Sequence, residues 1–295
     1  MLASSIKRLF KQFGFSPQLA PIAKQPVKEK VAFIHIAKCG GISIDNALRA
    51  VFAQPGDKRL CRETSIAGSL ANYQSPIETL EDCCDFSEHH LLHLQHVLKY
   101  FAQSNHSFIS GHWGVNSEIL KAHAHKRDFI TVLRDPESRL KSNYIFNKLS
   151  NSLKIMPPNN INTDSVISEA KEIVFGRRGW QMANTQIAFI AGKYPKHLDD
   201  AKKLQSTFID NLNHFKLVGF LEDLPSFKKQ FYATYQKDVR IKKHNATSRL
   251  VDGTKQLMLD DLRQFFDDKS TKRHLEKICS VEKESYLIAK ERHFE

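Results

Sequence analysis

Hydrophobic positions along the chain form two kinds of segment, short continuous apolar runs and longer stretches with helical spacing. The apolar runs are of strand length and predict buried parallel strands. They lie at Val31–Ile36, Ser107–Ser110, Phe129–Leu133 and Phe215–Phe220. The stretches with helical periodicity lie at 42–51, 88–103, 136–148, 164–175, 179–191, 198–213, 225–236 and 271–292. Because strands alternate with helices, the pattern predicts an α/β domain around a parallel sheet with helices on both faces.

The segments outside these elements set the domain boundaries. Residues 14–30 contain three prolines and predict an extended linker. Residues 54–85 are polar and predict an irregular segment, and 151–163 predict a polar loop. The expected organisation is an N-terminal amphipathic segment and linker over 1–30, followed by a single domain over 31–295.

Residues 1–15 carry apolar side chains at helical spacing with lysine and arginine between them. Two interpretations stay open: peripheral contact with an anionic membrane surface, and a short helix packed on the domain. No stretch of the chain approaches 18 consecutive apolar residues, so no membrane-spanning helix is predicted. The basic start lacks an apolar run of secretory length, and a cytoplasmic protein, in contact with the inner membrane face at most, is expected.

Composition adds a charge signal. The chain has 44 Lys and Arg against 32 Asp and Glu, a net charge of +12. This excess favours an anionic partner, such as a nucleotide, a nucleic acid, an acidic glycan or a lipid surface, without choosing between them. The five cysteines are odd in number and have no CxxC spacing, which is typical of reduced thiols.

A strand-to-helix turn follows the first apolar run. It consists of Lys38, Cys39, Gly40, Gly41, Ile42 and Ser43. The two glycines let the backbone curl close to an anion, and the following helix presents unpaired N–H groups and the positive end of its dipole. The pattern predicts a phosphate cradle, although it does not match GxxxxGK[ST]. Taken alone, the same residues also fit an ordinary turn with an incidental lysine.

A second constellation follows the third apolar run. Arg134 stands at the carboxyl end of a strand, where open α/β sheets bind ligands. Asp135 and Pro136 suit the N-cap and first position of the next helix. Arg134 and Ser142 are expected to converge on a second anion, through a planar guanidinium and a hydroxyl. A capped helix with solvated charges is the alternative.

Together, these motifs resemble those of the PAPS-dependent sulfotransferases. Residues 33–43 look like the 5′-phosphosulfate loop of that family, and residues 133–142 look like its 3′-phosphate motif. Phe108–His112 resembles the segment that carries the catalytic histidine in the heparan sulfate and uronyl 2-O-sulfotransferases and their bacterial relatives. Weaker similarity follows at 184–192, 215–222 and 245–247, so the resemblance covers roughly residues 31–292.

The resemblance implies a P-loop-like three-layer α/β domain that binds PAPS, releases PAP and requires no metal. Lys38 would stabilise charge on the leaving phosphate, and His112 would accept the proton of the acceptor hydroxyl. The cofactor-binding residues that it implies are Lys38, Cys39, Gly40, Gly41, Ile42, Ser43, Arg134, Ser142 and Thr247. The implied acceptor is an anionic carbohydrate or glycolipid, with no nucleic-acid partner.

Several positions depart from the family pattern, beginning with Ala37 in place of the usual proline. Cys39 and Ile42 stand where the usual loop has threonines, which predicts weaker or differently tuned cofactor contacts. Ala188 replaces an arginine often found there, so the identity of an acidic sugar acceptor is not carried over.

Other titratable residues compete with these assignments. Glu63 is a reserve base, and His35, inside the first predicted strand, is interpreted as a core histidine. His89 and His93 at i and i+4, near two cysteines, suggest zinc, but no second half with ligand spacing follows. The basic pairs Arg177-Arg178 and Lys242-Lys243, with His244, fit an anionic acceptor or a solvated surface equally. Trp180 fits a partly buried anchor or a sugar-stacking platform.

Two functions of other classes remain as alternatives. A P-loop kinase shares the strand–loop–helix cradle but needs a magnesium carboxylate, for which Asp135 is the single candidate. A non-catalytic basic protein that binds an acidic glycan or nucleic acid is the second alternative.

Overall fold

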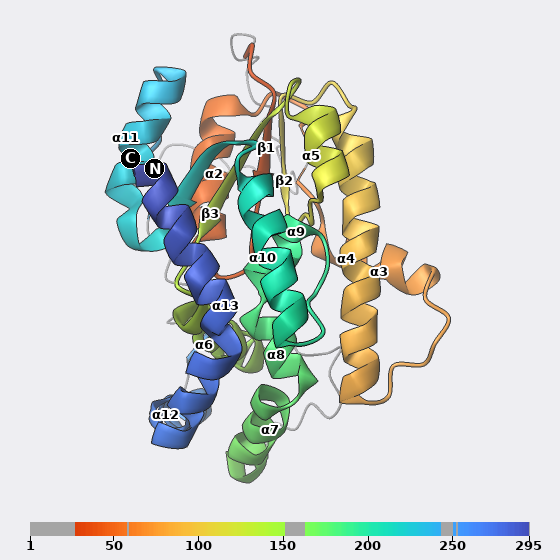
Figure 1. Cartoon of the computed structure of the whole chain (residues 1–295), viewed down its shortest axis with the longest axis vertical. Helices are drawn as coiled ribbons and strands as arrows, with labels where there is room; N and C mark the ends of the chain where they lie inside the picture. The colour runs from red at the N-terminus through yellow and green to blue at the C-terminus, as the bar shows by residue number, and fades with distance from the viewer. Residues whose placement is uncertain (1–26, 58, 151–162, 243–249, 252, 295) are drawn as a thin grey trace, which may run out of the picture.

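The computed structural model describes residues 27–57, 59–150, 163–242, 250–251 and 253–294. Its centre is a sheet of four parallel strands in the order β2-β1-β3-β4 (Figure 1). The strands are β1 (Val31–Ile34), β2 (Phe108–Gly111), β3 (Asp128–Leu133) and β4 (Phe215–Phe220). The predicted α/β class and parallel sheet are therefore confirmed.

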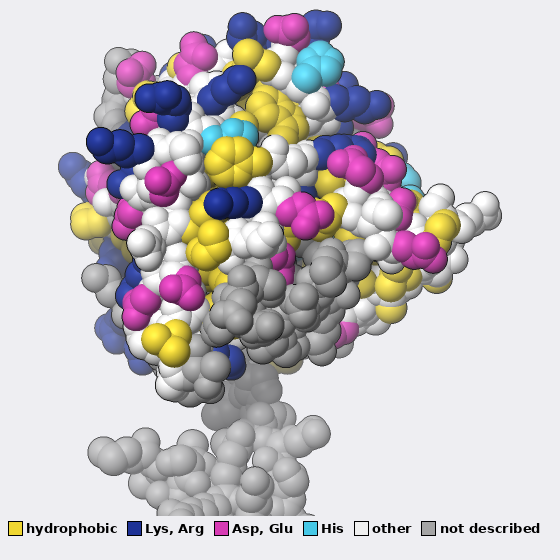
Figure 2. All heavy atoms as spheres, turned by 90° about the horizontal axis from the view of Figure 1, so that it is seen from below, with side chains coloured by type: hydrophobic (Ala, Val, Ile, Leu, Met, Phe, Trp, Pro, Cys, Tyr) yellow, Lys and Arg dark blue, Asp and Glu magenta, His cyan; other side chains and the backbone are white. Residues whose placement is uncertain are grey.

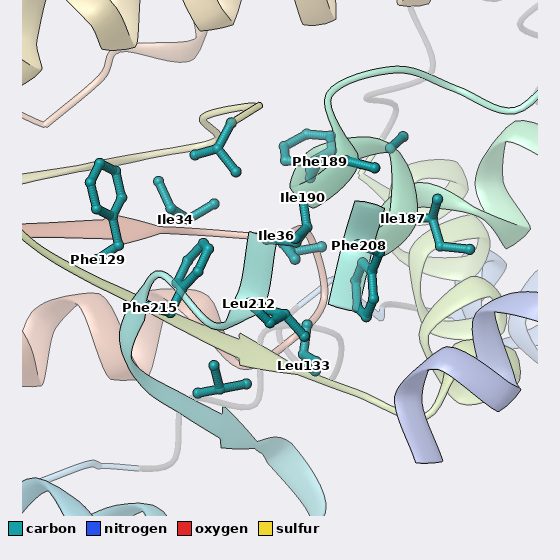
Figure 3. Packing of buried hydrophobic residues seen from close by; sticks show 14 of the residues in the cluster. Ile34, Ile36, Phe129, Leu133, Ile187, Phe189, Ile190, Phe208, Leu212 and Phe215 are labelled. Carbon is teal, nitrogen blue, oxygen red and sulfur yellow. The ribbon is translucent and has the colours of Figure 1, made fainter. Parts of the chain in front are cut away.

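Alternate residues of each strand face opposite layers of helices, as the period of a strand requires. On one face, Val31 and Phe33 pack with α2 (Gly41–Phe52) and α11 (Leu224–Tyr235). On the other, Ile34 and Phe129 pack with α9 (Thr185–Ala191) and α10 (Leu198–Leu212) (Figure 3). Because both faces are covered by apolar side chains, the molecule is a three-layer α/β structure.

A further hydrophobic cluster lies beyond the carboxyl ends of the strands (Figure 1). It is built by helices that follow β3 or belong to the C-terminal part of the chain: α6 (Pro136–Leu149), α7 (Thr163–Phe175), α8 (Arg177–Ala183), α12 (Gly253–Asp267) and α13 (Lys269–Phe294). Trp180 packs against both this cluster and the sheet cluster, and its Nε1 donates to Pro195 O at 2.7 Å. Trp180 is thus a partly buried anchor, the first of its two interpretations.

Half of the segment predicted to be irregular is helical. It contains α3 (Arg62–Ala71) and the first turns of α4 (Leu80–Ala102), which starts eight residues earlier than expected. The Thr79 hydroxyl accepts from Asp82 N, and the Asp82 carboxylate accepts from Thr79 N, a reciprocal capping box that begins α4. Polar composition concealed these helices because α3 buries few of its side chains.

Other boundaries also differ from the prediction. β1 ends at Ile34, two residues earlier than expected, and the expected helix over 179–191 is divided at Asn184 into α8 and α9. α5 (Ser117–His123) and α12 were not predicted. The helix after Asp135 is confirmed, with Ser138 N donating to Asp135 Oδ1 at 3.0 Å. The predicted N-terminal segment and nearly all of the 151–163 loop lie outside the described residues. None of the helices that the structure describes is long and apolar enough to cross a membrane.

Candidate active site

The register of the sheet brings the sequence motifs to one edge. Ile34 pairs with Gly111 on one side and with Thr131 on the other. The residues that follow these strands therefore meet at the carboxyl edge, where ligands bind in open α/β sheets. Arg134 is thereby placed next to the turn that links β1 to α2.

The turn between β1 and α2 has the geometry of an anion cradle. Lys38 and Gly40 both adopt left-handed backbone conformations, with φ of 68° and 73°. A Cβ on Gly40 would lie 2.6 Å from Leu221 Cδ1, so both the conformation and the space there favour glycine. Gly40 is the N-cap of α2, whose first N–H groups have no acceptor within the helix and are suited to bind an anion.

A cavity of about 760 Å³ opens in front of this turn. Eight of the predicted site residues line it: Lys38, Gly40, Gly41, Ile42, Ser43, His112, Arg134 and Ser142. Among the described residues that line the cavity, four are lysine or arginine and none is Asp or Glu: the cations are Lys38, Arg62, Arg134 and Arg178. A cavity lined by several cations and no described acidic residue attracts anions.

The ammonium of Lys38 lies over the Phe146 ring, 3.9 Å from the ring centroid. Burial and, to a smaller extent, the positive charge of Arg134 together lower its pKa to about 8. The Arg134 Nη1 donates to Lys38 O at 3.0 Å, which joins the two cationic motifs directly. A bound anion would relieve the repulsion between the two charges.

Arg134 is held by contacts on both its backbone and its side chain. Its N–H donates to Gln186 Oε1, and its carbonyl accepts from Gln186 Nε2, each at 2.9 Å. Its Nε lies 4.0 Å from Glu222 Oε1, and Glu222 also accepts from the Tyr286 hydroxyl at 2.9 Å. The guanidinium remains on the cavity surface, so it combines a fixed backbone with an accessible charge.

Two histidines form the floor between the motifs. The rings of His35 and His112 stack, with centroids 4.2 Å apart and planes at 28°. Burial lowers the pKa of His112 to about 4, opposed by a hydrogen bond to the His35 backbone. Burial also lowers the pKa of His35 well below its usual value. His35 follows β1, and its ring is buried against Phe33 and Gly41 and also lines the cavity.

The opposite wall contains residues that the sequence prediction missed. His90 of α4 lines the cavity, its Nδ1 is 2.6 Å from Ser69 Oγ, and burial lowers its pKa to about 4. Arg62 of α3 lines the cavity as well, and its charge acts on both His90 and His112. The signal for Arg62 was the helical spacing of α3, which the polar composition of 54–85 obscured, whereas His90 lies in a helix that the sequence did predict.

Some predicted residues do not reach the cavity. Cys39 is 1% exposed, its Sγ lies 3.8 Å from Gln186 Oε1, and burial raises its pKa to about 12. Its side chain is therefore part of the core rather than of the cofactor site, and its N–H donates to Ile36 O. Glu63 is exposed, accepts from the Cys61 thiol and does not line the cavity. Thr247 lies outside the described residues.

The two adjacent arginines of α8 have different partners. Arg177 forms ion pairs with α4, to Glu81 at 3.0 Å, Asp85 at 2.7 Å and Glu88 at 2.8 Å. Arg178 lines the cavity, and its Nη1 donates to Ser87 Oγ at 2.7 Å and Gln181 Oε1 at 2.9 Å. The basic pair therefore divides into one neutralised surface residue and one cavity residue.

The other basic and histidine residues that the sequence suggested as anion or zinc ligands form no site among the described residues. Lys243 and His244 lie outside the described residues. His89 lies 3.2 Å from Ser69 O through Nε2, and no group of three or more His, Cys, Asp or Glu suited to a metal occurs among the residues described. On the face seen from below in Figure 1, lysine and arginine are interspersed with Asp and Glu, so the excess charge does not gather there (Figure 2).

No protein-family model matches this chain, and a search of curated proteins finds no significant match.

Proposed function

We propose that this protein is a sulfotransferase with a P-loop-like fold, which moves a sulfuryl group from PAPS to a hydroxyl of a carbohydrate or glycoconjugate. The observation that carries the proposal is the convergence of three distant segments on one cavity. Lys38 and the start of α2, Arg134 with Ser142, and His112 all line it, and no described lining residue is acidic. A donor with two separate anionic groups and a hydroxyl acceptor together match this arrangement.

The donor fits the cavity through its two phosphate-containing ends. The 5′-phosphosulfate suits the first turn of α2, where Gly40, Gly41 and Ser43 surround the helix N-terminus and Lys38 adds a charge. The 3′-phosphate suits Arg134 and Ser142 on the neighbouring motif. Since Arg134 already contacts the Lys38 carbonyl, the two subsites adjoin.

The transfer itself forms a bond between the acceptor oxygen and sulfur and breaks the bond between sulfur and the bridging phosphate oxygen. His112 accepts the proton of the hydroxyl, and a positioned base contributes about 100- to 10,000-fold to such a step. Lys38 stabilises the charge that develops on the leaving phosphate oxygen. PAPS supplies the sulfuryl group, and PAP leaves as the second product.

The acceptor would occupy the part of the cavity that Arg62 and Arg178 line. These two arginines are not needed for the two phosphates, which favours an acceptor that carries a negative charge. The resemblance to glycan sulfotransferases favours a cell-surface polysaccharide or glycolipid precursor. An enzyme of the cytoplasm, in contact with the inner membrane face through residues 1–15, fits this acceptor.

The two alternatives receive less support from the same contacts. Asp135, the carboxylate that a kinase reaction would need for magnesium, caps α6 and is paired with Lys283. A purely binding role leaves unexplained why a neutral histidine stands beside the cradle.

Thermal unfolding with PAP, with ADP and with ATP plus magnesium tests the donor. A ligand at 100 times its dissociation constant stabilises the folded state by about 2.7 kcal/mol, so PAP is expected to raise Tm by several degrees. Arg134→Ala should abolish the shift, whereas Arg177→Ala should retain it because Arg177 is paired with α4. Stabilisation by ATP only with magnesium would support the kinase, and no shift with any nucleotide would contradict donor binding.

The chemistry is tested by sulfate transfer from radiolabelled PAPS to a panel of glycans and glycolipids. His112→Gln is expected to lower kcat by about 100-fold or more while PAP still raises Tm. Equal activity of His112→Gln and the native protein would remove His112 from the mechanism.

A further inference from the structure

His35 and His112 occupy equivalent positions on two paired strands. His35 is the first residue after β1, and His112 is the first residue after β2. Ile34 pairs with Gly111, so the two histidines that follow these residues lie opposite each other on neighbouring strands. The His35 N–H donates to Gly111 O at 2.9 Å, which extends the ladder by one bond and holds the two rings face to face.

The His35 ring is fixed from its other side by α2. A Cβ on Gly41 would overlap the His35 ring, so the absence of a side chain at the first position of α2 makes room for that ring. Gly41 does not have a positive φ, and its glycine is therefore explained by this close approach and not by backbone conformation. Phe33 stacks on the same ring, with centroids 5.8 Å apart.

The His112 ring also interacts with the His35 backbone, and this contact opposes the effect of burial on the pKa of His112. Because the His35 N–H already donates to Gly111 O, the His35 carbonyl is the group that accepts from the His112 ring. A neutral imidazole that donates from one nitrogen presents a lone pair on the other. No side chain among the described residues forms a hydrogen bond with the His112 ring, and His112 lines the cavity.

We propose that His35 is a positioning residue for His112, whose ring and carbonyl hold the His112 imidazole in one tautomer with the second nitrogen open to the cavity. Histidine bases are often oriented by a carboxylate, and here a stacked imidazole and a carbonyl take that place. The positioning is a property of the free protein. Its catalytic consequence rests on the proposed function.

The charged and titratable groups around the pair all disfavour a protonated ring. Arg59, from the segment after α2, acts on His35, and Arg62 of α3 acts on His112. His90 of α4 lines the same cavity and interacts with His112. No carboxylate among the described lining residues would stabilise a protonated His112. Removal of the His35 ring is expected to admit water, which reduces the effect of burial and returns the pKa of His112 toward the ordinary histidine value of about 6.5.

Long-range ¹H–¹⁵N NMR of the free protein tests this, with the His112 signals assigned from His112→Gln. The native protein should show one His112 tautomer, unprotonated at pH 6. In His35→Ala the apparent pKa should rise by about two units, with both tautomers populated. Gly41→Ala, which retains His35 but displaces its ring, should shift His112 in the same direction. His35→Phe, which retains a stacked ring, should keep the native tautomer.

Unchanged His112 signals in both His35→Ala and Gly41→Ala would overturn the proposal. If one of the two variants fails to fold, the His112 signals of the other variant provide the test. In a sulfate-transfer assay, His35→Ala should lower kcat by about 100-fold and move the acid limb of the pH profile upward, since misplacement of a catalytic group has costs of that order. A different outcome separates the two proposals. If His35→Ala loses the single tautomer but the native protein transfers no sulfate, the proposed function is contradicted and the positioning role of His35 stands.

Discussion

The side-chain amide of Gln186 pairs with both polar backbone groups of Arg134, as a neighbouring strand would. Its Oε1 accepts from the Arg134 N–H, and its Nε2 donates to the Arg134 carbonyl, each at 2.9 Å. The same Oε1 lies 3.8 Å from the Cys39 thiol, and Nε2 also donates to the buried Glu282 at 3.0 Å. Gln186 thus links α9 and α13 to both anion-binding motifs.

Gln186→Ala should destabilise the protein and weaken PAP binding together. Removal of the amide leaves buried partners unsatisfied, which costs about 1–3 kcal/mol, and frees the Arg134 backbone. Urea unfolding and PAP titration measure the two effects. Gln230→Ala is the control, because Gln230 donates to His293 O at 2.7 Å outside the cavity lining. It should change stability and leave PAP affinity as it is, and a parallel loss of affinity there would contradict a specific role for Gln186.

The affinity for PAP should fall as the pH rises above 8. In the free protein the pKa of Lys38 is lowered to about 8, first by burial and then by Arg134, and a bound phosphate raises it again. Binding above pH 8 therefore requires uptake of a proton, and affinity should decrease by about tenfold per pH unit. Calorimetry in buffers of different ionisation enthalpy measures the proton uptake. Lys38→Arg, which stays charged, should bind PAP without this dependence, and a steep dependence in that variant would refute the assignment.

Stability should decrease as the pH falls from about 6.5 to 4. Burial lowers the pKa of His90 and His112 to about 4 and that of His35 well below its usual value, whereas the unfolded chain binds protons near pH 6.5. The folded state is therefore fully favoured above pH 6.5, and each histidine lowers the free energy of unfolding by up to about 1.4 kcal/mol per pH unit below it. Urea titrations at several pH values measure the slope. His90→Asn should show a shallower slope, and an unchanged one would argue against a buried neutral His90.

The two adjacent arginines of α8 should respond differently in catalysis. Arg178 lines the cavity, whereas Arg177 is paired with Glu81, Asp85 and Glu88 of α4. Under the proposed function, Arg178→Ala should raise KM for an anionic acceptor about tenfold or more, the usual effect of losing a charge-assisted hydrogen bond, and leave PAP affinity unchanged. Steady-state kinetics with varied acceptor measures this. Arg177→Ala should leave KM unaltered, so an equal effect of both substitutions would place the acceptor elsewhere.

Local patterns were sufficient for the central sheet and for much of the site. The four apolar runs became the four parallel strands, and most of the strongly periodic stretches became helices within two residues of their expected ends. Eight of the ten predicted site residues line one cavity. These predictions held because strand burial, helix capping and glycine conformation act over a few neighbouring residues.

Only the tertiary structure decided which side chains face the cavity. Cys39 is buried in the core although it stands between two cavity residues, and His35 is buried and lines the cavity as well. The wall formed by α3 and α4 depends on the packing of polar helices whose composition resembles a loop. The sequence by itself determined the strands and the two cationic motifs, because local chemistry defines them. The stacked histidines and the Gln186 link required the fold, because strand register and helix packing join residues that are 52 to 147 positions apart.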